Sequence, residues 1–230
     1  MGGSPPLSAE PAPSLFLELF REAVEVPGPE TEAIGAACRE ADVMAVVGIN
    51  ERRPNTTGTL YNTQLFFGRD GALLHKHQKY VPTVGERIVH APGQTGSKAS
   101  VVADFGTLSG LICGENGNPR AGAVSTYSRS LASALMCFVI NSVAVVGQDV
   151  IEKYGADRAI VDFLQAEKKN AGQPLWAPGV VLAGPLEEEE GIVYAEVDTE
   201  GLVKLKYGLD YAGHYNRPEI FAHHFERFLK

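Results

Sequence analysis

The chain has 230 residues, of which 44% are hydrophobic, and this is enough apolar material to build a sizeable core. Its formal net charge of −8 argues against a nucleic-acid partner, because proteins that bind polyanions need a basic face. The three cysteines, Cys38, Cys113 and Cys137, are odd in number and far apart, unlike a secreted disulfide framework, so we expect a reducing, cytoplasmic location.

The N-terminal part of the chain is predicted to be helical after a short tail. Residues 1–13 are rich in Pro, Ser and Ala, so we expect a flexible tail there and a single domain over residues 14–230. Apolar residues at helical spacing predict a helix that begins near Ser14 and ends before a Pro-Gly-Pro turn. A second helix is predicted over Glu30–Ala41, with Cys38 on its buried stripe.

Three strands are predicted next. Val43–Asn50 is a continuous apolar run, which predicts a strand buried on both faces. Leu60–Phe67 and Ala72–Tyr80 are predicted as two strands joined by a glycine-bounded turn. Successive side chains of a strand point to opposite faces, so we expect Lys79 and Lys76 on opposite sides of the sheet.

The C-terminal half is predicted to alternate strands and helices. The longest apolar stretch, in the middle of the chain, is too short to span a bilayer, and the first residues lack the pattern of a signal peptide, so no membrane partner is expected. The alternation indicates an α/β fold. The predicted elements are strands at Ala99–Ala103, Thr107–Cys113, Met136–Val146 and Ile192–Val197, a helix at Asp157–Gln165 and a solvated turn at Glu187–Glu190.

The segment Leu111–Asn116 is the first candidate site. Cys113 is expected to close a strand, and Gly114 then permits the sharp backbone turn of a nucleophile elbow. A thiol held at such a turn near a cation has more thiolate character and attacks carbon more readily. Position alone also fits an inert thiol at a strand end, because free cysteines are usually buried.

The second candidate block contains Lys79 and Glu86. Taken singly, a lysine at a strand end is usually solvated, and a glutamate in a turn usually forms only a surface ion pair. His75 and His77 are two residues apart and so share one face of the predicted strand. The sequence offers no matching cysteines or carboxylates to complete the three or four ligands that zinc requires. We therefore predict no metal and no other cofactor.

Several motifs occur in an order that resembles the nitrilase branch of the carbon-nitrogen hydrolases. The resemblance runs from about Leu15 to Phe221 and implies a nitrilase-type α-β-β-α sandwich in truncated form, assembled as a homo-oligomer through the helices on the elbow side. The motifs are Tyr61–Gly68, His77–Thr83, Gly85–Arg87 and Leu111–Asn116, with further likeness at Val181–Leu186 and Gly213–Pro218.

The resemblance also implies roles for the candidate residues. Cys113 would be the nucleophile, Lys79 would stabilise charge on the attacked nitrogen or oxygen, and Glu86 would position Lys79 and the substrate. The implied reaction converts a small-molecule nitrile to a carboxylic acid and ammonia through a thioimidate and a thioester on the cysteine.

Two departures from the family pattern bear on activity. The family's general base is a first glutamate in a Phe-Pro-Glu segment, which has no counterpart here, and neither Glu10 nor Glu18 is assigned to that role. About one helix and one strand expected after Cys113 are also missing, and Gly114 stands where many nitrilases have tryptophan. Three functions stay open: a nitrilase with weak activity, an amidase, or a catalytically impaired relative that acts as a subunit or interaction module.

Overall fold

The computed structural model describes residues 13–95, 100–117, 132, 135–142, 147–153, 158, 161–162, 165, 175–178, 180–184, 186 and 191–208. The chain divides into two compact units, Met1–Asn116 and Gly117–Lys230. All candidate site residues lie in the first unit. Almost all of the predicted tail, residues 1–12, lies outside the described residues, and the single domain over 14–230 stays a prediction.

The first unit is built on an antiparallel sheet of three strands, β1 (Ala45–Arg52), β2 (Leu60–Phe67) and β3 (Leu73–Gln78), in the order β1-β2-β3. Two helices precede the sheet, α1 (Pro13–Glu22) and α2 (Pro29–Ala41). The bounds of α2 and the three strands agree with the sequence predictions to within about two residues, since the apolar periodicity is strong in this part of the chain. Helix α1 ends at Glu22, before the Pro-Gly-Pro turn, as predicted.

Helix α2 begins and ends where its sequence dictates. Pro29 occupies the first turn, where a missing N–H costs nothing, and Glu30 and Glu32 complement the helix dipole. Asp42 ends the helix in the left-handed conformation, with φ of 52°.

A hydrophobic cluster of the first unit lies on the face of the sheet that α2 covers. Cys38 of α2 packs with Leu65 and Phe67 of β2, and all three are buried. A Cβ atom at Gly35 of α2 would lie 2.4 Å from the carbonyl oxygen of Gly71, so the helix approaches the β2–β3 turn as closely as a glycine allows. The predicted core position of Cys38 is thus confirmed.

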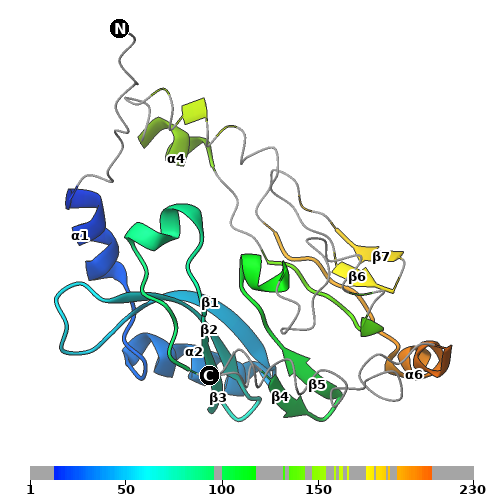
Figure 1. Cartoon of the computed structure of the whole chain (residues 1–230). Helices are drawn as coiled ribbons and strands as arrows, with labels where there is room; N and C mark the ends of the chain where they lie inside the picture. Colours follow the sequence, from blue (N-terminus) through cyan, green and yellow to red (C-terminus); the bar gives the residue numbers. More distant parts are fainter. Residues whose placement is uncertain are drawn as a thin grey trace, which may run out of the picture. The chain divides into compact units, whose positions relative to one another are not determined.

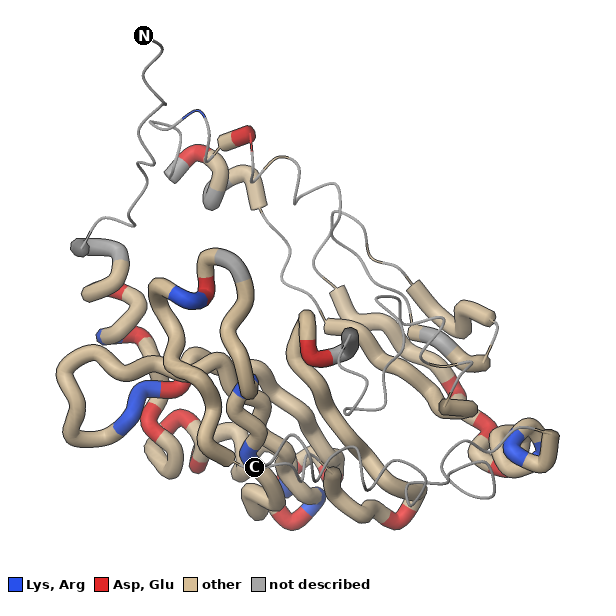
Figure 2. Tube along the Cα trace, in the orientation of Figure 1, with Lys and Arg blue, Asp and Glu red and all other residues tan. Residues whose placement is uncertain are grey.

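The opposite face of the sheet is approached by the chain that follows a hairpin of β4 (Ser100–Ala103) and β5 (Gly106–Ser109). This chain leads into a short 3-10 helix, η2 (Cys113–Gly117), and another, η1 (Val84–Ile88), follows β3 (Figure 1). Charged residues are spread in short segments over the described elements (Figure 2). The charges that distinguish the site are therefore the few that are buried.

The second unit contains α4 (Gln148–Lys153), a hairpin of β6 (Leu175–Ala177) and β7 (Val180–Ala183), and α6 (Thr199–Gly208). The described residues of the predicted helix Asp157–Gln165 are helical. The turn Glu187–Glu190 and the motif Gly213–Pro218 lie outside the described residues. Among the helices that the structure describes, none combines the length and apolarity required to span a membrane.

Four strand predictions need correction. β1 is not buried on both faces: Val46 is 40% exposed, because alternate side chains of the strand point away from α2. The strand predicted to end at Cys113 ends at Ser109, since its pairing with β4 stops there. Ile192–Val197 forms no strand, and Ile192 is exposed. Of Met136–Val146, residues 136–142 form no strand and residues 143–146 lie outside the described set.

The sheet predicts a matched pair of stability changes. Leu65→Ala should lower the free energy of unfolding by about 2–5 kcal/mol, because the leucine is fully buried in the core. Leu74→Ala should change it by less than about 0.5 kcal/mol, because Leu74 of the neighbouring strand is 45% exposed. Urea unfolding of both variants tests this prediction. Equal losses of stability would show that Leu65 is no more buried than Leu74 in the folded protein.

Candidate active site

Lys79 is a buried cation at the end of β3. Its side chain is 1% exposed, and its backbone N–H extends the pairing with β2 by donating to the Asn62 carbonyl oxygen at 2.8 Å. The ammonium donates to the Glu86 carboxylate and to the Thr83 hydroxyl, the latter at 3.1 Å. A buried ammonium needs such partners, because removing an unpaired charge from water is very unfavourable.

Glu86 is held in place by the local sequence Thr-x-x-Glu. The Thr83 N–H donates to the Glu86 carboxylate at 2.9 Å, and the Glu86 N–H donates to the Thr83 carbonyl oxygen at 3.0 Å, which starts η1. The Thr83 hydroxyl and the Asn62 side-chain amide donate to the same carboxylate at 2.9 and 2.7 Å. Burial raises the pKa of Glu86, but hydrogen bonds from Lys79, Thr83 and Asn62 outweigh it and bring the pKa to about 2.

Asn62 and Thr83 are site residues that the sequence analysis did not single out. A signal for Thr83 was present, because Ser or Thr followed three residues later by Glu is the pattern of a capping box. Asn62 had no such signal. Asn62 contributes because its side chain lies on the face of the sheet toward which Lys79 also points.

Cys113 lies at the first residue of η2 in a strained backbone conformation. Its φ is +50°, which side chains other than glycine rarely adopt, and its side chain is exposed. Two bonds close the turn around it: the Ile112 N–H donates to the Glu115 carboxylate at 2.7 Å, and the Glu115 N–H donates to the Ile112 carbonyl oxygen at 3.1 Å. The turn therefore holds the thiol away from the chain that precedes it, the geometry expected of an elbow.

The segment that carries Cys113 lies on the Lys79 face of the sheet. A Cβ atom at Gly110 would lie 2.4 Å from the Gln64 side-chain oxygen, and Gln64 and Asn62 share a face of β2. A Cβ atom at Gly114 would lie 3.3 Å from the methyl carbon of Thr83, whose hydroxyl contacts Lys79. The structure thus brings the cysteine turn next to the Lys79–Glu86 pair.

Glu115 ties the two segments together. Its carboxylate accepts the Tyr80 N–H at 2.7 Å in addition to the Ile112 N–H, and it lies 2.8 Å from His77 Nε2. Glu115 and His77 are both buried. The sequence analysis placed Glu115 in the elbow without assigning it a role.

The alternating histidines do not form a metal site in the described structure. His77 faces Glu115 and contacts the Tyr80 ring edge-on at 4.9 Å, and His75 packs against the Phe66 ring at 5.5 Å. Burial lowers the pKa of His75, and the charge of His77 adds to this effect. No group of three His, Cys, Asp or Glu side chains among the described residues is placed to hold an ion.

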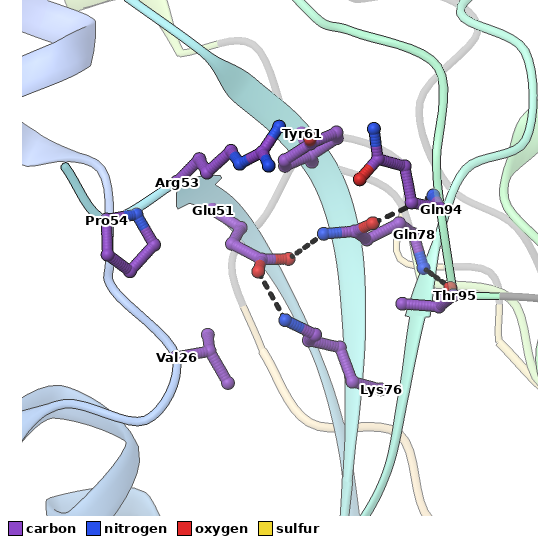
Figure 3. Close-up of a pocket in the computed structure, with 9 residues that line it drawn as sticks. All are labelled: Val26, Glu51, Arg53, Pro54, Tyr61, Lys76, Gln78, Gln94 and Thr95. Carbon is purple, nitrogen blue, oxygen red and sulfur yellow. Dashed lines mark hydrogen bonds and ion pairs between the residues drawn. The ribbon is translucent and has the colours of Figure 1, made fainter. Parts of the chain in front are cut away.

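Lys76 belongs to a separate polar network on the other face of the sheet (Figure 3). Its ammonium donates to buried Glu51 at 2.5 Å, and the same carboxylate accepts from Gln78 at 2.9 Å and Thr63 at 2.8 Å. Gln78 in turn accepts the Gln94 N–H at 2.9 Å, which fixes the loop beyond η1. The two lysines thus lie on opposite faces, as strand alternation predicts, and Lys76 is kept away from the cysteine turn.

The chain is similar to nitrilases and related hydrolases. Residues 5–149 match the family described as carbon-nitrogen hydrolase. The chain is 31% identical to Nitrilase 3 of an unknown prokaryotic organism over 90% of this chain and 69% of that protein, and 32% identical to an aliphatic nitrilase of Sinorhizobium fredii over 90% and 72%. The structure is also similar to the crystal structure of Saccharomyces cerevisiae Nit3, a member of branch 10 of the nitrilase superfamily. The match covers 87% of this chain and 78% of the Nit3 chain, with a TM-score of 0.62 and 20% sequence identity. This similarity confirms the nitrilase-type α/β fold.

The low pKa of Glu86 predicts how stability depends on pH. A carboxylate whose pKa falls from 4.5 to about 2 on folding stabilises the protein fully above its unfolded pKa, and this contribution is lost as the pH falls toward about 2. Urea midpoints measured from about pH 5 to about pH 2 should therefore fall less steeply for Glu86→Gln than for the unchanged protein. Parallel curves would show that the partners of Glu86 do not lower the pKa of its carboxyl group in the folded protein.

The thiol environments predict an order of alkylation. Cys113 is exposed, Cys137 is half-buried with a pKa raised by burial, and Cys38 is 3% exposed. Iodoacetamide should label Cys113 first, Cys137 more slowly and Cys38 only on unfolding, as measured by peptide mass mapping. Faster labelling of Cys38 in the folded protein would contradict this order, and Cys113→Ser identifies the peptide that carries the fast signal.

Proposed function

Since the chain belongs to the carbon-nitrogen hydrolase family, we propose that it hydrolyses a small-molecule nitrile to a carboxylic acid and ammonia with Cys113 as the nucleophile. The observation that carries this proposal is the strained turn that presents an exposed thiol beside a buried lysine that is paired with a glutamate. The relatives named as nitrilases, at about 30% identity, support a nitrile as the substrate.

The proposed chemistry proceeds through two covalent intermediates. The Cys113 sulfur bonds to the nitrile carbon while the nitrogen takes up the thiol proton, which gives a thioimidate. Addition of one water breaks the carbon–nitrogen bond, releases ammonia and leaves a thioester. A second water breaks the carbon–sulfur bond, which releases the acid and restores the thiol.

Lys79 and Glu86 act on the charge that develops during attack. The Lys79 ammonium stabilises negative charge on the nitrogen, and on the oxygen during hydrolysis of the thioester. Glu86 pairs with the ammonium and fixes its direction, because the carboxylate is itself held by Thr83 and Asn62. Fixed charges of this kind stabilise a transition state without reorganising as it forms.

Turnover distinguishes this function from the two other candidates. Purified protein is incubated with a panel of nitriles and the corresponding amides while free ammonia and intact protein mass are followed. Ammonia from nitriles supports a nitrilase, and ammonia from amides alone supports an amidase. A covalent adduct that accumulates without ammonia supports an impaired relative, because general acid-base assistance is typically worth about 10²–10⁴ in rate.

Substitution of the two lysines supplies a matched test of the site. Cys113→Ala should abolish ammonia release, and Lys79→Gln should lower kcat about 10²–10³-fold, the cost of removing a preorganised stabilising group. Lys76→Gln is the control, because it also removes a lysine that is paired with a glutamate but lies on the other face. Equal losses of kcat for the two lysine variants, after correction for the folded fraction, would contradict the assignment of Lys79.

A further inference from the structure

Glu115 is a buried carboxylate whose hydrogen bonds join the two segments of the candidate site. It is 7% exposed, and one oxygen accepts the Tyr80 N–H at 2.7 Å. The other oxygen accepts the Ile112 N–H at 2.7 Å and lies 2.8 Å from His77 Nε2. Because charged acceptors form the stronger hydrogen bonds, this carboxylate connects the two segments firmly.

The residues that Glu115 contacts flank the two candidate catalytic groups. Ile112 immediately precedes Cys113, and Tyr80 immediately follows Lys79. The two segments are far apart in the sequence, since Tyr80 and Glu115 are separated by 35 positions. One side chain therefore fixes the backbone next to the thiol relative to the backbone next to the ammonium.

The same contacts argue against a role in proton transfer. Burial raises the pKa of Glu115, but the hydrogen bonds from His77, Tyr80 and Ile112 outweigh it and lower the pKa. One oxygen faces both the Ile112 N–H and His77 Nε2, so a proton on that oxygen would displace one of these two contacts.

We propose that Glu115 is the positioning residue of the active site, which holds the Cys113 turn beside Lys79 by accepting the backbone N–H groups of Ile112 and Tyr80. This inference rests on the proposed function for its catalytic consequence, but not for the structural connection itself. Without the carboxylate, the strained turn at Cys113 loses the side-chain bond that closes it, while the Lys79–Glu86 pair keeps its own partners.

Two substitutions separate positioning from proton transfer. Glu115→Ala removes both acceptors and should lower kcat about 10²-fold, the order expected when a reacting group is misplaced by about 1 Å, with KM little changed. Glu115→Gln keeps one carbonyl oxygen, so one backbone N–H retains its acceptor and the other faces an NH₂ group. Its kcat should lie between those of Glu115→Ala and the unchanged protein, whereas a general base would make the glutamine variant as inactive as the alanine variant.

Hydrogen exchange tests the connection without substrate. In the Glu115 variants, peptides covering residues 110–117 and 77–83 should exchange faster than in the unchanged protein. Glu51→Gln is the matched control, because Glu51 is also a buried carboxylate bound to three side chains but lies on the opposite face of the sheet. It should destabilise the protein without selectively exposing these two segments, and its kcat should stay unchanged once corrected for the folded fraction.

The outcomes are distinguishable. Unchanged exchange in Glu115→Ala would overturn the connection, and faster exchange with unchanged kcat would overturn the positioning role. A glutamine variant as inactive as the alanine variant would also overturn it, in favour of a base. Failure of the unchanged protein to release ammonia from any nitrile or amide would instead defeat the proposed function, and the exchange data would still decide whether Glu115 makes the connection.

Discussion

The arrangement of the site depends on the burial of one positive charge. Lys79 is 1% exposed, and an ammonium that far from water is tolerated only when a carboxylate and further acceptors surround it. The Glu86 side chain must therefore point toward the end of β3. The hydrogen bonds between Thr83 and Glu86 at the start of η1 hold it in that direction. Asn62 then completes the carboxylate's contacts from β2. The position of η1 is thus set by the charge that it neutralises.

A lysine–glutamate pair with one buried partner does not by itself mark an active site, because the sheet carries two such pairs. On the α2 face, Glu51 binds Lys76, Gln78 and Thr63, and that network pins a loop through Gln78 and Gln94 (Figure 3). The pairs resemble each other in chemistry and differ in their neighbours. Only the Lys79 pair has the cysteine turn beside it, through the close approach of Gly114 to Thr83.

Sequence analysis predicted what depends on local pattern and missed what depends on pairing over long distances. Alternation along β3 was enough to separate Lys79 from Lys76, and apolar spacing was enough to place Cys38 in the core. The apolar residues of Ile192–Val197 predicted a strand that does not form, because a strand also needs a neighbour to accept its backbone hydrogen bonds. The connection made by Glu115 was invisible for the same reason: its partners include a backbone N–H 35 positions away, which no motif records.

The strain at Cys113 explains why a buried carboxylate is needed two residues later. A φ of +50° at a residue with a side chain is unfavourable and persists only when its surroundings over-determine it. The reciprocal bonds between Ile112 and Glu115 provide one constraint, and the bond to Tyr80 provides a second that a free-standing turn would lack. Gly114 lets the turn pack closely against Thr83, whose methyl carbon would lie only 3.3 Å from a Cβ atom at this position. The turn is consequently held against the segment that carries Lys79, so the conformation that exposes the thiol also places it beside the cationic side chain.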